Sequence, residues 1–216
     1  MKHAASQVFA FFPRISLKLR LMHNWQSAFP KTIETLIKQG LGKIVEGFEY
    51  ELNFQQLRLD LRWFPVFLKM QNCPARILEL AEFEYLRAQV KTQDLGRPRL
   101  EEGLLAVNPS AQFMEVRHHL PEINRAPGLF CLVKEGGRSF EMELSLPQAL
   151  LLDLLREDRK YTAEQLLDQA QLHEVKIPLS LQEWRQTLMS LLETGVILQS
   201  EASAHRLQPR LSPFSH

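Results

Sequence analysis

The sequence predicts an α+β protein, with a helical N-terminal domain followed by a winged-helix-like C-terminal domain built from a β-hairpin and three helices. Three observations lead to this prediction. Apolar residues recur with a helical period in the N-terminal part, a Gly-Gly pair separates two alternating segments near residue 136, and three helix-start signatures follow in succession. We expect domains at 1–95 and 111–200, a linker at 96–110 and a flexible tail at 201–216.

The composition is that of an ordinary globular protein. Of the 216 residues, 45% are apolar and 24% are charged, and the formal net charge is +1. These values favour a packed core, and they argue against a nucleic-acid binder held mainly by phosphate contacts. Cys73 and Cys131 lie far apart, and neither belongs to a CxxC motif. The cysteines therefore indicate a reducing compartment.

The N-terminus does not have the pattern of a secretory signal. Its apolar patch, VFAFF, is short, is followed at once by Pro13, and precedes Arg14, Lys18 and Arg20. A signal peptide has a longer apolar region that ends in small residues. No apolar run approaches membrane-spanning length. We therefore expect a cytoplasmic protein with no membrane partner.

Two helical regions are expected in the N-terminal domain. The first covers residues 24–50, where Gly40 and Gly42 mark a break between two shorter helices. The second is CPARILELAEFEYLRAQV, with Pro74 in its first turn. Between them, QLRLDLRWF alternates as a strand does, but its place between helices leaves its type open.

The C-terminal domain begins with a hairpin. Segments 131–133 and 140–144 flank Gly136-Gly137, which can take the positive φ angles that a two-residue turn demands. Phe140, Met142 and Leu144 alternate with glutamates, so their side of the strand is expected to be buried. The stretch QFMEVRHH is a candidate for an earlier strand.

Three helices follow the hairpin. Each starts with a capping box, in which a hydroxyl and a side-chain oxygen three residues later satisfy free backbone N–H groups: Ser145 with Gln148, Thr162 with Gln165, and Ser180 with Glu183. The predicted helices are 146–157, 163–172 and 181–194, with Gly195 at the C-terminal cap and VILQ as a short returning strand.

No arrangement of residues predicts catalysis, so we expect no enzyme, no metal site and no cofactor. The adjacent His118 and His119 would point to opposite faces of a strand, and His173-Glu174 does not form an HExxH motif. Cys131, inside a strand, is interpreted as a buried inert thiol. The glutamates that follow Pro74 are interpreted as a solvated helix face: Glu79, Glu82 and Glu84.

A winged-helix transcription regulator is the alternative function. Such a protein needs basic side chains on its third helix, whereas LQEWRQTLMSLLET carries only Arg185. The turn KEGGRS, taken as the wing, adds Lys134 and Arg138, so we expect no nucleic-acid partner. An apolar stripe on the third helix is either core packing or the wall of a groove beside the hairpin edge, and it contains Trp184, Leu188 and Leu191.

The stretches FCLVKEGGRSFEMELSLPQALLLDLL, YTAEQLLDQA and WRQTLMSLLETGVIL resemble the C-terminal domain of the HvfC/BufC family. These are partner proteins of multinuclear non-haem iron oxidases that modify ribosomally made peptides, and their C-terminal domain is similar to the PqqD-like precursor-recognition element. The segment from Pro74 to Glu84 resembles the P-x-x-L-x-E-L-A-x-x-E helix of the same family.

The resemblance implies a non-catalytic subunit in a hetero-complex with an iron oxidase. The leader of a precursor peptide would add a strand to the hairpin edge, at Ser139, Phe140, Glu141 and Met142, and its side chains would lie in a groove walled by Trp184, Leu188 and Leu191. The helical N-terminal domain would dock on the oxidase, which would supply the chemistry.

Overall fold

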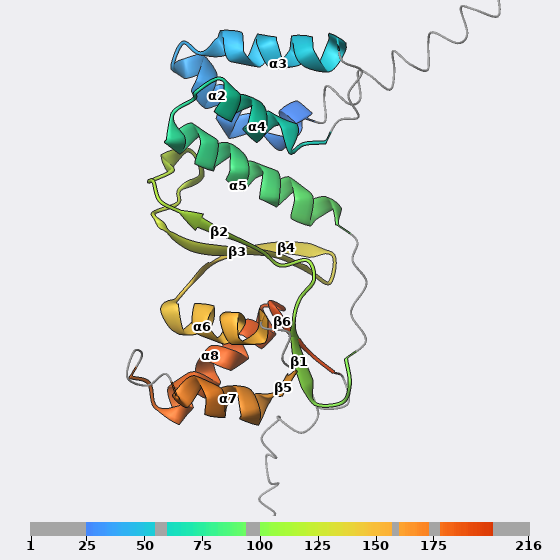
Figure 1. Cartoon of the computed structure of the whole chain (residues 1–216), viewed down its shortest axis with the longest axis vertical. Coiled ribbons are helices and arrows are strands. Elements are labelled where there is room, and N and C mark those ends of the chain that lie inside the picture. The colour runs from blue at the N-terminus through green and yellow to red at the C-terminus, as the bar shows by residue number, and fades with distance from the viewer. Residues whose placement is uncertain (1–24, 55–59, 94–99, 157–159, 173–177, 201–216) are drawn as a thin grey trace, which may run out of the picture. The chain divides into compact units, whose positions relative to one another are not determined.

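The computed structural model describes residues 25–54, 60–93, 100–156, 160–172 and 178–200 (Figure 1). Helices and two small antiparallel sheets make it an α+β protein. The chain divides into two compact units, the first formed by residues 1–89 and 116–127 and the second by 90–115 and 128–216. The segment 116–127, which we expected in the C-terminal domain, belongs to the first unit. The expected flexible tail at 201–216 lies outside the described residues.

The first unit contains α2 (Pro30–Lys38), α3 (Gly42–Phe54), α4 (Trp63–Met70) and most of α5 (Ala75–Thr92). The predicted break in the first helical region is confirmed, because α2 and α3 are separated by Gly40 in the left-handed region with φ 75°. The predicted helix after Pro74 is α5. The alternating segment does not continue as a strand beyond the undescribed residues 55–59, since Asp60 to Arg62 lead directly into α4.

Phe64 of α4 lies at the centre of the core of the first unit. Its ring centroid is 5.0 Å from that of Trp25 and 4.8 Å from those of Phe29 and Phe48. All four rings are buried, and their tilted arrangement is the geometry that aromatic pairs prefer. The packing of Phe64 therefore anchors one face of α4 in the core of the first unit.

Two glutamates of α5 bind other segments of the first unit. The carboxylate of Glu84 accepts hydrogen bonds from the backbone N–H groups of Lys31 and Thr32, both at 2.9 Å, and from Thr32 Oγ1 at 2.8 Å. Glu84 thereby satisfies donors that the start of α2 leaves without helical partners. The carboxylate of Glu79 accepts from the backbone N–H groups of Arg117 and His118 and lies 2.9 Å from His118 Nδ1.

The prediction of a solvated carboxylate face on α5 is therefore wrong for these two residues and holds only for the exposed Glu82. The carboxylates of Glu79 and Glu84 are covered by other segments and accept hydrogen bonds from their backbone N–H groups. The helical pattern of α5 does not reveal these contacts.

The second unit has one sheet with the order β5-β1-β6, made of β5 (Tyr161–Thr162), β1 (Leu104–Val107) and β6 (Ile197–Gln199). Central strand β1 pairs Leu105 with Tyr161 on one side and with Gln199 on the other. Strand β1 falls within the expected linker at 96–110, so this part of the segment is structured. The predicted strand at VILQ is confirmed as β6.

The other sheet has the order β2-β3-β4, with β2 (Gln112–Val116), β3 (Gly128–Glu135) and β4 (Arg138–Leu144). The predicted hairpin is confirmed: Gly136 and Gly137 have φ angles of 57° and 80°, and Glu135 pairs with Arg138 across the turn. The predicted earlier strand is β2, which ends before His118. The hairpin does not join the sheet of β1, so its interpretation as the wing is wrong.

The three helices of the second unit begin where their capping boxes predict. They are α6 (Leu146–Arg156), α7 (Ala163–Gln171) and α8 (Leu181–Glu193). Gly195 ends α8 in the left-handed region, with φ 70°. The Gly195 N–H donates a hydrogen bond to Leu192 O, and the Val196 N–H donates one to Leu191 O, each at 3.0 Å. The hairpin and the helices enclose one core, which includes Cys131, Val133, Leu151 and Trp184. Across the described ranges, no helix combines the length and apolar character needed to cross a membrane.

Candidate functional site

Strand β4 is the outer strand of its sheet (Figure 1). Because Glu135 and Arg138 flank a two-residue turn, they form a hydrogen-bonded pair, and such pairs alternate along the hairpin. Phe140 and Met142 therefore direct their backbone groups toward β3. The N–H and C=O groups of Ser139, Glu141 and Glu143 point away from β3, toward the outer edge. The residues predicted for strand addition thus lie on an edge strand.

The side chains of β4 are less buried than the alternation predicts. Phe140 is 43% exposed, Met142 is half-buried, and only Leu144 is buried. Phe140 pairs with the buried Val133 but lies on the outer strand near the turn, where the core covers it only in part. The prediction of a buried Phe140 is therefore wrong, and its ring is accessible beside the edge.

The three residues proposed as a groove wall on α8 belong to the core instead. Trp184 and Leu191 are completely buried, and Leu188 is 3% exposed. All three are members of the cluster that includes Cys131 and Val133. Core packing is therefore the interpretation that fits Trp184 and Leu191, because a fully covered side chain offers no surface to a peptide.

A groove does run along another side of α8, between this helix and α7, with a volume of about 580 Å³. Helix α8 contributes residues at helical spacing, of which Leu181 and Met189 are 37% and 41% exposed. The α8 residues that line the groove are Leu181, Arg185, Leu188, Met189 and Leu192. Leu188 is the one member of the predicted wall that reaches it.

The opposite wall of this groove comes from α7. It consists of Ala163, Glu164, Leu167 and Asp168, with the two carboxylates exposed and Leu167 buried. Sequence reasoning did not find this groove, although the exposed apolar positions 181 and 189, eight residues apart, were a usable signal.

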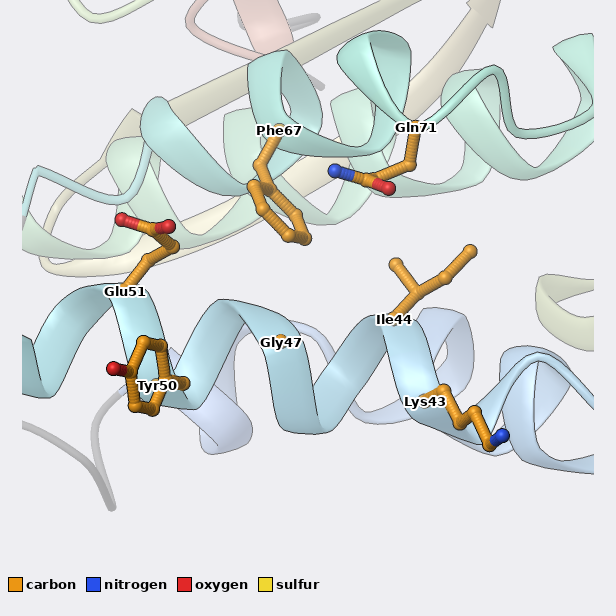
Figure 2. A pocket seen from close by; sticks show the side chains of 7 residues that line it. All are labelled: Lys43, Ile44, Gly47, Tyr50, Glu51, Phe67 and Gln71. Atoms are coloured by element: carbon orange, nitrogen blue, oxygen red, sulfur yellow. The ribbon is translucent and has the colours of Figure 1, made fainter.

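A smaller hollow of about 300 Å³ lies in the first unit between α3 and α4. Figure 2 shows Phe67 of α4 directed toward α3 above Gly47, with Gln71 further along α4. A Cβ atom at Gly47 would lie 3.6 Å from Phe67 Cζ, which is an ordinary van der Waals contact, so the ring packs closely over this glycine. Lys43 and Glu51 of α3 lie at opposite ends of the hollow (Figure 2).

Helix α4 is apolar on its outer side as well as in the core. Trp63, Val66 and Met70, spaced at i, i+3 and i+7, are 48%, 44% and 71% exposed. Apart from Lys69, the exposed residues of α4 are apolar, and exposed apolar patches commonly mark protein interaction surfaces. This α4 stripe, together with the neighbouring hollow, is the candidate interaction surface of the first unit.

Two of the reactive side chains considered from the sequence, Cys131 and His118, have surroundings that the structure defines. The predicted burial of Cys131 is confirmed, and this burial raises the pKa of its thiol to about 12, so the thiol stays protonated at neutral pH. In the ranges that the structure describes, no group of three or more His, Cys, Asp and Glu side chains is placed to hold a metal ion. His118 is instead engaged with Glu79.

Comparisons of this chain with models of known protein families and with curated proteins find no significant match.

Proposed function

We propose that this chain is a non-catalytic partner subunit that binds the leader of a ribosomally synthesised precursor peptide and presents it to a multinuclear non-haem iron oxidase. In this proposal the chain is an HvfC/BufC-type protein, located in the cytoplasm, and its second unit is a winged-helix-like, PqqD-like recognition domain. The resemblance of the three C-terminal stretches to that family is the starting point.

The edge position of β4 is the observation that carries the proposal. An extended leader that pairs with β4 would use the backbone groups of Ser139, Glu141 and Glu143, which point away from β3. The half-exposed ring of Phe140 and the partly covered Met142 would offer it apolar contacts. Strand addition needs no catalytic residue on this chain, which agrees with the inert Cys131 and the His118–Glu79 contact.

The first unit would bind the oxidase. Its α4 stripe of Trp63, Val66 and Met70 supports this role, because an enzyme subunit could cover the apolar face that the first unit leaves exposed. The hollow with Lys43 and Glu51 at its ends would add polar contacts that fix the orientation.

DNA binding is the second candidate function, and one observation favours it. The order α6, β5, α7, α8 and β6, with β1 completing the sheet, follows the helix and strand order of winged-helix proteins. Against it, the only basic residue of α8 is Arg185, and that residue lines an apolar groove opposite two carboxylates. Such a surface is poorly suited to phosphates.

Co-expression tests the proposal. The chain would be produced with an iron oxidase and a precursor peptide encoded beside it, and then analysed by size exclusion and by mass spectrometry of the peptide. We expect co-elution, and modification of the peptide only when all three components are present. Separate elution together with full oxidase activity in the absence of this chain would contradict the proposal, and nanomolar binding to its own promoter DNA would favour the alternative.

The edge itself is tested with a matched pair at one position. Ser139→Pro removes an outward N–H, whereas Ser139→Ala removes only an exposed side chain. Loss of one hydrogen bond of about 0.5–1.5 kcal/mol, with added steric obstruction, predicts leader binding about tenfold weaker for the proline variant and nearly unchanged for the alanine variant. Equal affinities for two folded variants, verified by circular dichroism, would place the leader elsewhere.

A further inference from the structure

We propose that the groove between α7 and α8 is a second subsite, which receives a segment of the leader peptide that carries an aliphatic side chain next to a lysine or arginine. The inference rests on the proposed function, because it names the chemistry of the peptide that the second unit would bind. It concerns residues other than those of β4, and strand addition alone does not require it.

The base and one side of the groove are lined by apolar residues and can bind an apolar side chain. Leu167 and Leu188 are buried at its base, while Leu181 and Met189 remain more than one third exposed along its side. A volume of about 580 Å³ accommodates a few side chains and is in the range of ordinary ligand sites. Methionine adapts its shape to different partners, so Met189 suits a binding surface.

The rim of the groove selects for positive charge. Glu164 and Asp168 lie one helical turn apart on α7, and within the described part of the chain neither carboxylate has an ion-pair partner. Like charges at this spacing repel each other, and a cation from a partner would relieve that repulsion. Arg185 on the opposite wall is the single basic lining residue, so the lining carries an excess of negative charge.

The stability of α7 explains why an acidic residue stands at position 164, but not at position 168. Glu164 lies in the first turn of α7, where a negative charge interacts favourably with the helix N-terminus. Asp168 is the sixth residue of the helix, where that interaction has faded and aspartate is a weak helix former. Asp168 is therefore the residue whose position a basic ligand accounts for best.

A peptide library displayed on phage, with 12 random residues, serves as the probe against the full chain. Enriched peptides would be synthesised with a fluorescent label and titrated by anisotropy at low and high salt. The variants are Asp168→Lys, which reverses the rim charge, and Met189→Glu, which places a carboxylate in the apolar wall. Asp153→Lys is the matched control, because Asp153 is an exposed residue of α6 outside the groove.

We expect the enriched peptides to share Lys or Arg beside Leu, Ile or Met, and their binding to weaken with salt. Asp168→Lys and Met189→Glu should each reduce affinity about tenfold, and Asp153→Lys should leave it within about twofold. Peptides re-selected against the Asp168→Lys variant should carry Asp or Glu at the basic position.

Three results would overturn the subsite. If Ser139→Pro abolishes binding while both groove variants retain it, leader recognition occurs at β4 alone, and the proposed function survives. If deletion of residues 201–216 is needed before any peptide binds in the groove, the chain's own C-terminal segment is the occupant. A library that yields no binder at all would contradict both the subsite and the proposed function.

Discussion

At the scale of the residue, burial decides what a side chain does in this chain. Burial raises the pKa of Glu84, and the hydrogen bonds from Lys31 and Thr32 offset this rise only in part. The same carboxylate would be a solvated group on an exposed helix. Trp184 is the apolar counterpart: its ring is completely covered, and its Nε1 has no hydrogen-bond partner in the structure.

The core position of Trp184 gives a prediction. Trp184→Ala should lower the free energy of unfolding by about 3–5 kcal/mol, because it leaves a large cavity. Trp184→Phe should cost much less, since the lost N–H makes no hydrogen bond and most of the ring volume remains. Urea unfolding followed by circular dichroism measures both values. A Trp184→Ala variant within about 1 kcal/mol of the parent would show that the ring is not packed as described.

At the scale of the element, residues at the helix ends determine where the helices begin and stop. Thr162 and Ser180 each form a complete capping box with the residue three positions on, and α7 and α8 start directly after them. Gly195 ends α8 in a left-handed conformation, and its carbonyl accepts a hydrogen bond of 2.8 Å from Asn108 Nδ2. The end of α8 is thereby tied to the residue that follows β1.

Gly195→Ala should destabilise the second unit in two ways, through backbone strain and through a steric clash with Glu135. A Cβ atom there would lie 2.7 Å from Glu135 Cγ and 2.9 Å from Glu135 Cβ, and the φ of 70° disfavours alanine as well. Gly40→Ala is the control, because Gly40 has φ 75° and no atom within 4 Å of such a Cβ. We expect losses of about 1–2 kcal/mol for the control and more for Gly195→Ala in thermal melts. Equal losses would mean that Glu135 moves aside freely.

At the scale of the whole molecule, the first unit depends on a segment distant in sequence. Residues 116–127 return to it, and Glu79 holds their start through the backbone of Arg117 and His118. Arg76 Nη1 binds Glu122 at 2.6 Å further along the same segment. Burial disfavours ionisation of Glu79, but the hydrogen bonds from His118 and Arg117 outweigh it, so the pKa of Glu79 lies below its ordinary value.

This depressed pKa predicts how acid acts on the fold. A carboxyl whose pKa is lower in the folded state stabilises that state above its unfolded pKa, and the contribution is lost as pH falls through the folded pKa. The parent should therefore exceed Glu79→Gln in stability by about 1–3 kcal/mol at pH 7, and the gap should shrink below about pH 4. Denaturant unfolding at several pH values tests this, and a gap that does not change with pH would contradict it.

The features predicted correctly have local causes. A Gly-Gly pair demands a tight turn, and a hydroxyl with an amide or carboxylate three residues on starts a helix, whatever surrounds them. The predicted starts of α6, α7 and α8 coincide with the observed ones for this reason. Strand β1 was missed because its four residues form a strand only through β5 and β6, which lie far away in sequence.

The candidate site was predicted less well than the fold. The hairpin predicts β3 and β4, but β4 is an edge strand only because β2 pairs with β3, which the hairpin does not decide. The helical period of α8 likewise does not say which of its apolar stripes faces inward. The stripe with Trp184 is in the core, and the stripe with Leu181 and Met189 lines the groove. The distinction depends on where α6 and α7 pack, which a single sequence does not reveal.

The interleaving of the two units along the chain has a consequence for how such a protein can be inherited and engineered. The backbone passes between the units near residues 89, 115 and 127, so no single cut separates two intact halves. Splitting the gene near residue 110 would take residues 116–127 away from the first unit and β1 away from the second. Recombination that joins the second unit to a different helical unit would need several simultaneous junctions. The two units should therefore have been transmitted together, and chimaeras should be built by grafting side chains onto the intact chain.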